Sequence, residues 1–234
     1  MFKNKIGIML IGALLAMGVV GPGSRSEASL LLNTPTGLAD GAQFRFVFVT
    51  PGTRDATSTS IGDYNSFVNT QAGGAMFNDT IVTWYAIAST SAVNAKDNIT
   101  GLQTTPIYLA NGTKVANDLS VNAGGLWSGS LAAPINNTLT AQLATFVWTG
   151  ANPDGTGLGG NELGTGGPIA GFSSESASYW ILAMPGSSPE PLSLYGISEV
   201  LTAQTSAVPE PSTYALFSLG LGGLALLKRR QKKA

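Results

Sequence analysis

Residues 44–49 read Phe-Arg-Phe-Val-Phe-Val, a run rich in aromatic and β-branched residues that predicts a β-strand. A Thr-Ser cap at residues 59–60 and apolar residues at helical spacing then predict a helix that begins at Ile61 and ends at the glycine pair 73–74. Residues 81–88, Ile-Val-Thr-Trp-Tyr-Ala-Ile-Ala, are expected to form a buried strand. The domain is therefore expected to open with a strand, a helix and a second strand.

Short strands and turns are expected after this first unit. Residues 106–109 and 114–116 flank Asn111-Gly112, a dipeptide typical of β-hairpin turns. Further strands are expected at residues 145–148 and 179–183. One early helix followed by short antiparallel strands and long loops indicates an α+β fold.

Composition and charge exclude several classes of function. The two apolar ends of the 234-residue chain leave about 180 residues, enough for one domain. Residues 29–208 include four basic and eleven acidic residues, a net charge of −7, so the surface repels phosphate backbones and nucleic acid is excluded as a partner. Cysteine and histidine are both absent, which excludes disulfides, zinc sites and His-based catalysis.

The N-terminus has the three parts of a signal peptide. Lys3 and Lys5 precede an apolar run at residues 6–20, and small residues then predict cleavage between Ala28 and Ser29. The apolar run of 15 residues would be roughly 22 Å long as a helix, shorter than the roughly 30 Å hydrocarbon core of a bilayer. Residues 1–28 are therefore expected to be removed on export. An uncleaved membrane anchor is the alternative.

The C-terminus contains three further elements in a fixed order: the tripeptide Pro209, Glu210 and Pro211, an apolar run at residues 214–227, and the cations Lys228, Arg229 and Arg230. The cations are expected to stay on the cytoplasmic side, so a short transmembrane helix leaves the tripeptide outside, where its prolines keep the backbone extended. A second Pro-Glu-Pro at residues 189–191 has neither following element and is interpreted as a loop.

This C-terminal order resembles the PEP-CTERM sorting tag. The resemblance implies cleavage by an exosortase in the inner membrane of a Gram-negative bacterium that also produces exopolysaccharide. A plain C-terminal membrane anchor is the alternative. The export machinery, the exosortase and exopolysaccharide or other matrix components are the partners that this resemblance implies.

The middle of the chain resembles the endostatin-like branch of the C-type-lectin-like fold. The matching segments are residues 46–50 (FVFVT), 83–90 (TWYAIAST), 93–98 (VNAKDN), 107–113 (IYLANGT), 126–131 (LWSGSL), 133–136 (APIN) and 147–150 (VWTG). The disulfides usual in that fold are impossible here, so packing of Trp84, Trp148 and Trp180 would replace them. The triplets typical of calcium-dependent sugar binding are missing, so the resemblance does not extend to sugar binding.

The expected organisation is a signal peptide (1–28), a C-type-lectin-like domain (29–187), a linker (188–207) and a sorting signal (208–234). The most suggestive loop in the domain is Gly-rich and offers oxygen ligands for calcium, namely Asn152, Asp154, Asn161 and Glu162. A solvated surface loop is the favoured interpretation of this segment, and no cofactor is expected. Trp127 lies in a turn-like Gly-Gly-Leu-Trp-Ser-Gly context and is the tryptophan expected to contact a ligand, with burial under a loop as the alternative.

The sequence thus predicts a secreted or cell-surface protein without enzymatic activity, which acts as a structural or binding module in an extracellular matrix or biofilm. A calcium-assisted carbohydrate-binding module is the first alternative. A polysaccharide hydrolase is the second, because carboxylate pairs can be distant in sequence. The carboxylates available for it are Asp63, Asp79, Asp97, Asp118, Glu162 and Glu175.

Overall fold

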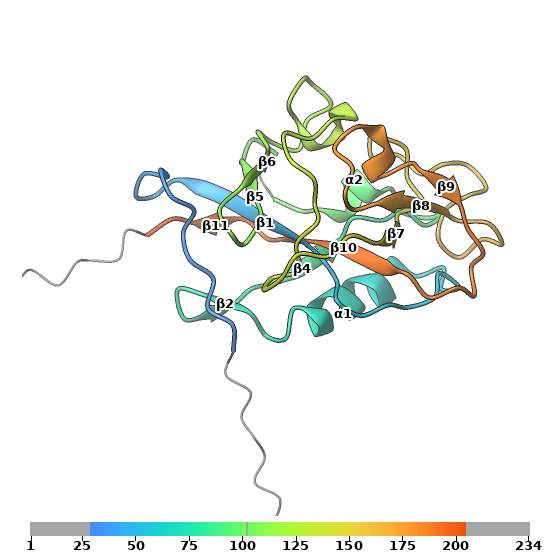
Figure 1. The fold of residues 1–234 in the computed structure, drawn as a ribbon, viewed down its shortest axis with the longest axis horizontal. Helices are drawn as coiled ribbons and strands as arrows, with labels where there is room; N and C mark the ends of the chain where they lie inside the picture. Colours follow the sequence, from blue (N-terminus) through green and yellow to red (C-terminus); the bar gives the residue numbers. More distant parts are fainter. Residues whose placement is uncertain (1–28, 102, 205–234) are drawn as a thin grey trace, which may run out of the picture.

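The centre of the fold is an antiparallel pair of strands from opposite ends of the domain, β1 (Gln43–Val49) and β10 (Ser193–Ser198) (Figure 1). Val47 lies opposite Ile197, and every residue of β10 is buried. A strand buried along its whole length has neighbours on both edges and both faces. The computed structural model describes residues 29–101 and 103–204, and this pair joins the two ends of that range.

Nine of the described strands form one sheet in the order β6-β5-β1-β10-β7-β8-β9, with β11 paired to β1 and β4 paired to β10. The bounds of the other strands in this sheet are β4 Trp84–Ala86, β5 Ile107–Tyr108, β6 Lys114–Ala116, β7 Phe146–Trp148, β8 Ile169–Phe172, β9 Met184–Pro185 and β11 Leu201–Thr202. Strands β2 (Met76–Phe77) and β3 (Thr80–Ile81) form a separate hairpin. The α+β class expected from the sequence is confirmed at this coarse level.

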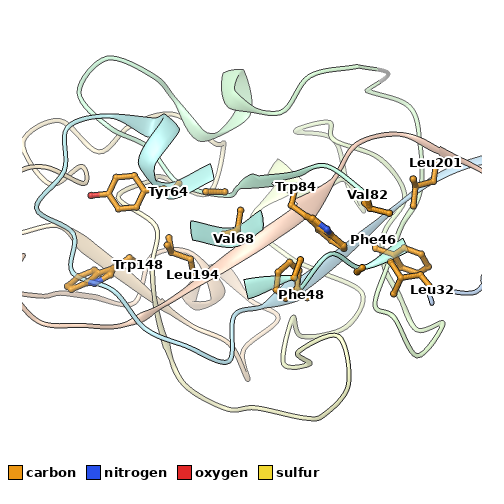
Figure 2. Close-up of a cluster of buried hydrophobic side chains, with 14 of the residues drawn as sticks. Leu32, Phe46, Phe48, Tyr64, Val68, Val82, Trp84, Trp148, Leu194 and Leu201 are labelled. Carbon is orange, nitrogen blue, oxygen red and sulfur yellow. The ribbon is translucent and has the colours of Figure 1, made fainter. Parts of the chain in front are cut away.

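Alternation along β1 divides the core into two clusters. Phe44, Phe46 and Phe48 point to one face, where Trp84 and Trp148 also lie (Figure 2). Val47 and Val49 point to the opposite face, where Trp127 and Trp180 lie. Since successive side chains of a strand point to opposite faces, the Phe-x-Phe-x-Phe pattern supplies both clusters from one strand.

The three tryptophans expected in the core are there. Trp84, Trp148 and Trp180 have at most 1% of their surface exposed. The edge of the Phe48 ring meets Trp84 at a centroid distance of 4.8 Å, and the Trp148 indole N–H donates to the carbonyl of Glu190 at 3.1 Å. Burial of such large aromatic side chains contributes strongly to the hydrophobic stabilisation of the domain.

Arg45 is the one cation inside β1, and it is completely buried. Its guanidinium donates to the carbonyl oxygens of Ser198 and Thr100. Burial lowers the pKa of Arg45, while Tyr85 and Glu199 act in the opposite direction. The strand pattern therefore accommodates a charged residue because backbone carbonyls of neighbouring segments accept its hydrogen bonds.

The expected helix is α1 (Ile61–Gln71), with Ser60 at the N-cap position and Gly73 and Gly74 in the left-handed region after its end. The side chain of Ser60 makes no capping bond; Ser58 instead donates to the carboxylate of Asp63 in the first turn at 2.6 Å. A short helix, α2 (Ala95–Asn98), and the 3-10 turns η1 (Leu126–Ser128) and η2 (Ser178–Trp180) complete the described helical elements.

Two asparagines of α1 cover the free edge of β4. The Asn69 amide donates to the Trp84 carbonyl at 2.6 Å and accepts from the Trp84 N–H at 3.0 Å. One turn earlier, the Asn65 side-chain oxygen accepts from the Ala86 N–H at 2.8 Å, and Asn98 donates to the Ala86 carbonyl at 2.8 Å. Side-chain amides thus make the hydrogen bonds that a neighbouring strand would make, which leaves this edge closed to strand addition.

The structure corrects two expectations about the end of the domain. Residues 179–183 were expected to be a strand, but Ser178–Trp180 form η2, because the Trp180 N–H bonds the Ala177 carbonyl locally and turns the indole into the core. The expected linker at residues 188–207 contains β10 and β11, so the folded domain continues past residue 187. The 189–191 segment is a loop, as expected.

The Asn111-Gly112 hairpin is confirmed, with β5 and β6 antiparallel and Gly112 at a φ of 87°. The expected strand at residues 81–88 is shorter, since only Trp84–Ala86 pair with β10.

Among the described residues, no helix has both the length and the apolar character needed to cross a bilayer. The apolar runs expected at residues 6–20 and 214–227 lie outside the described residues.

Candidate functional site

The Gly-rich segment between β7 and β8 is the candidate ligand-binding loop of the domain. It begins after Trp148 and ends at Ile169, and it passes over the segments that carry Ala56, Ser89 and α2. The Leu163 N–H donates to the Ser89 carbonyl at 2.9 Å, and the Gly164 N–H donates to the Ala56 carbonyl at 2.8 Å. Backbone hydrogen bonds at these two points fix the loop against the rest of the domain.

The first half of the loop is a turn closed by its own polar side chains. Asn152 donates to the Thr156 hydroxyl and to the Gly157 carbonyl, both at 3.1 Å. The Asp154 carboxylate accepts from the Thr156 N–H at 3.0 Å and from its hydroxyl at 2.6 Å. These two hydrogen bonds, the hydroxyl first, hold the pKa of Asp154 below its usual value.

The second half of the loop is organised around Glu162, whose side chain is 9% exposed. Its carboxylate accepts from the Gly160 N–H at 2.8 Å. Asn161 donates to the Gly167 carbonyl, and Thr165 donates to the Glu162 carbonyl at 2.6 Å. Asn161 and Glu162 therefore stabilise the local turn in this structure.

Gly157 brings the two halves of the loop together and joins them to α2. Its N–H donates to the side-chain oxygen of Asn94 at 2.8 Å. A Cβ at this position would lie 3.1 Å from Glu162 Oε1 and 3.6 Å from Asn94 Oδ1, so both oxygens flank Gly157. The sequence does not identify Asn94 as a partner of the loop, because Asn94 lies 63 positions before Gly157 and belongs to no motif shared with it.

The geometry gives a mixed answer for calcium. The four candidate ligands lie in one loop, but the amides of Asn152 and Asn161 act as donors within it. Within residues 29–101 and 103–204 there is no group of three or more acidic side chains placed to hold a metal ion. Calcium prefers six to eight oxygen ligands, so a cation here would depend on backbone carbonyls as well as on Asp154 and Glu162.

Trp127, the tryptophan that the sequence offered as a ligand contact, is buried. Its side chain is 3% exposed and stacks on Trp180, with ring centroids 6.4 Å apart and an interplanar angle of 27°. The structure agrees with the alternative interpretation of the sequence, which was burial under a loop. Gly155 of the candidate loop lies directly on the indole, since a Cβ at this position would lie 2.8 Å from the Trp127 ring. The candidate loop therefore covers this indole, and Trp127 supports the loop from below.

Three of the other carboxylates considered for catalysis accept hydrogen bonds from residues close to them in the chain. Asp63 accepts from Ser58, Asp97 accepts from Asn94 at 2.6 Å, and Asp118 accepts from the Ser120 N–H at 2.8 Å. Each of these hydrogen bonds is local to its own turn or helix start.

Burial raises the pKa of Tyr64 to about 12 and the pKa of Tyr195 well above its usual value, so both phenols are neutral at physiological pH.

The sorting segment follows the last described residue, Gln204. A family model described as the PEP-CTERM protein-sorting motif matches residues 207–232. This chain carries a PEP-CTERM sorting motif. The match includes all six residues expected to act in sorting, namely Pro209, Glu210, Pro211, Lys228, Arg229 and Arg230. No curated protein matches the chain.

The PEP-CTERM motif has a direct consequence for the chain as a whole. It implies sorting by an exosortase, and it supports export to the cell envelope or the extracellular space. Residues 1–28, the predicted signal peptide, and the PEP-CTERM match at residues 207–232 lie outside the described residues.

Proposed function

We propose that this protein is a non-catalytic structural or binding module on the surface or in the extracellular matrix of a Gram-negative bacterium. An exosortase sorts it, and it associates with exopolysaccharide. The PEP-CTERM match at residues 207–232 is the observation that carries this proposal. The net charge of −7 between residues 29 and 208 suits a surface that stays soluble among matrix polymers.

The proposed domain type is C-type-lectin-like. The resemblance at residues 46–150 implies one early helix, a sheet of mostly short strands, and long loops. The described fold has these parts. The core packing of Trp84, Trp148 and Trp180 supports the idea that aromatic burial replaces the missing disulfides. Binding is the proposed activity because the 150–169 loop is held firmly, which lowers the entropic cost of ordering it around a ligand.

The two Pro-Glu-Pro copies provide a matched test of sorting. Glu210→Ala removes the acidic residue of the copy within the sorting motif, while Glu190→Ala makes the same change in the exposed loop copy. We expect Glu210→Ala to accumulate as an unprocessed, membrane-bound precursor in a host with an exosortase. Glu190→Ala should be processed like the wild type. Equal processing of both variants would refute the sorting proposal.

Association with the matrix needs its own measurement. The exported protein is washed from cells or co-sedimented with purified exopolysaccharide, and the bound fraction is compared with that in a host unable to make the polymer. We expect the bound fraction to fall in that host. Shortening of the polysaccharide chains on addition of the protein would contradict the non-catalytic part of the proposal and favour a hydrolase.

Calcium-assisted carbohydrate binding is the second candidate. One observation favours it: Glu162 Oε1 and Asn94 Oδ1 both flank Gly157, and Glu162 is nearly buried. A cation bound by the folded state alone would raise the melting temperature by several degrees at saturating calcium. Glu162→Gln should abolish that rise. An unchanged melt of the wild-type protein would remove this candidate.

A further inference from the structure

Three apolar side chains form a patch on the β2–β3 hairpin, in which Leu31 and Ile81 are exposed and Met76 is half-buried. Leu31 pairs with Met76 in a parallel bridge, and Met76 pairs with Ile81 in the antiparallel hairpin. Residues directly opposite each other point to the same face. Their chain neighbours Leu32, Phe77 and Val82 are buried, so Leu31, Met76 and Ile81 point outward. We call these three residues the hairpin patch.

The hairpin patch contains the two most exposed large apolar side chains of the described residues. Ile81 is 65% exposed and Leu31 is 63% exposed. Scattered exposed apolar residues are normal on a protein surface, but adjacent ones in register form a contiguous apolar surface that favours contact with an apolar partner. The partner can be identified from the position of the patch on the fold.

The patch lies where the described chain both begins and ends (Figure 1). Thr34, three residues after Leu31, donates to the Gln204 carbonyl at 3.4 Å. Asn78, three residues before Ile81, donates to the Thr202 carbonyl at 3.4 Å. The point from which the chain continues to the sorting motif is therefore next to the hairpin patch.

Chain length then limits how far this end of the domain can be from a membrane. Nine residues, 205–213, separate Gln204 from the apolar run at 214–227. At no more than about 3.6 Å per residue they reach roughly 32 Å. A domain of this size has a diameter of about 40 Å, so this tether keeps the Gln204 end facing the bilayer while the apolar run is held there.

We propose that the hairpin patch rests on the lipid surface of the membrane in the form of the protein that still carries its sorting segment. The three side chains enter the interfacial region and hold the domain in one orientation beside its own cleavage site. Cleavage near Pro211 frees the domain from the apolar run and leaves the patch too small to hold it there alone. The inference rests on the proposed sorting.

The charge near the patch indicates the lipid. Asp79 lies in the turn between β2 and β3, at a φ of 62°. A carboxylate at this position is repelled by anionic headgroups, so a zwitterionic surface such as phosphatidylcholine is the appropriate probe. Addition of anionic lipid should weaken the contact at low salt.

The absence of cysteine makes the test direct, because one introduced thiol is the only labelling site. The chain from Ser29 to Ala234, which keeps all described residues, is reconstituted in phosphatidylcholine vesicles. A nitroxide is attached at Ile81→Cys or, as a matched control, at Val121→Cys. Val121 is 60% exposed and lies in the loop after β6, which is at the top of Figure 1, away from the hairpin.

We expect the label at position 81 to be several-fold more accessible to oxygen, relative to a water-soluble nickel complex, than the label at 121. Leu31→Ser should lower the ratio at 81 and leave the ratio at 121 unchanged. Equal ratios at 81 and 121 in vesicle-bound protein would refute the patch contact and leave the sorting proposal intact. Dipolar broadening between labels at 81 would show pairing with a second copy and also refute it. Failure of the chain to bind vesicles would refute both proposals.

Discussion

Asn69→Ala tests whether side-chain amides of α1 replace a strand at the edge of β4. In the wild type, the Asn69 amide makes two hydrogen bonds to the backbone of Trp84 and one to the carbonyl of Asn65 one turn earlier. Alanine removes all three. The Trp84 N–H and carbonyl then lose the partner that satisfies them beside a fully packed indole.

The expected cost follows from those contacts. A hydrogen bond contributes about 1 kcal/mol net, and a partly buried group left without its partner costs about 1–3 kcal/mol. Two effects lower this cost. Alanine recovers a few tenths of a kcal/mol through its higher helix propensity, and water hydrogen-bonds to the backbone at a site that is half-buried. A loss of about 2 kcal/mol in the free energy of unfolding is expected, or about 4–8 °C in melting temperature for a domain of this size.

Thermal unfolding followed by circular dichroism measures the effect. Ser66→Ala is the matched control, since Ser66 lies on the outer face of the same helix and donates only to the Gly62 carbonyl at 2.9 Å. Its melting temperature should stay within about 1–2 °C of the wild type, the usual range for surface substitutions. Asn69→Asp, of the same shape but without the donor, should be destabilised as well. If Asn69→Ala melts like Ser66→Ala, water satisfies the β4 edge and the reasoning is refuted.

Two further substitutions test the packing of β8 and the loop turn. In Gly171→Ala the new Cβ would lie 1.9 Å from the Trp180 carbonyl oxygen, and backbone cannot rotate away as a side chain can, so we expect the free energy of unfolding in chemical denaturation to fall by about 3 kcal/mol or more. Gly159→Ala is the control, because a Cβ there meets nothing within 4 Å. Equal stabilities of the two variants would contradict the close approach. The hydrogen bonds from Thr156 hold the folded-state pKa of Asp154 below its usual value, so its contribution to stability is present above the usual pKa of an aspartate and is lost as the pH falls through the folded-state pKa. Asp154→Asn should therefore melt below the wild type at pH 6, and the gap should close as the pH falls through the folded-state pKa of Asp154. A gap that stays constant with pH would show that the Thr156 contacts do not lower this pKa.

The parts of the fold that the sequence predicted are those set by local pattern. The Phe-x-Phe-x-Phe run of β1 predicts a strand with an apolar face, and Gly73-Gly74 predicts the end of α1. The Asn111-Gly112 turn and the sorting motif are likewise short, contiguous signals. In each case the residues that decide the structure are neighbours in the chain.

The errors come from tertiary context. Residues 193–198, Ser-Leu-Tyr-Gly-Ile-Ser, show only a weak alternation of apolar and polar residues and follow a proline-rich segment, so they resemble a linker. Their pairing with β1, some 150 residues earlier in the chain, makes them the central strand. Residues 179–183 have strand-like composition, but η2 forms because Gly171 lets the Trp180 carbonyl approach β8 closely.

The candidate site was predicted only in part for the same reason. The loop at 152–162 could be identified by its glycines and oxygen-bearing side chains. Its attachment to Asn94 and the cover it provides for Trp127 depend on distant segments. Tryptophan in a glycine-rich turn is ambiguous from the sequence, and the stack on Trp180 decides its burial.

Intact mass spectrometry of the exported protein tests the central claim most directly. Export with a removable signal peptide and cleavage at the PEP-CTERM motif predicts a chain that begins near Ser29 and lacks the residues beyond about Pro211. A protein recovered outside the inner membrane with Lys233 and Ala234 still attached, or one retained in the cytosol, would contradict it.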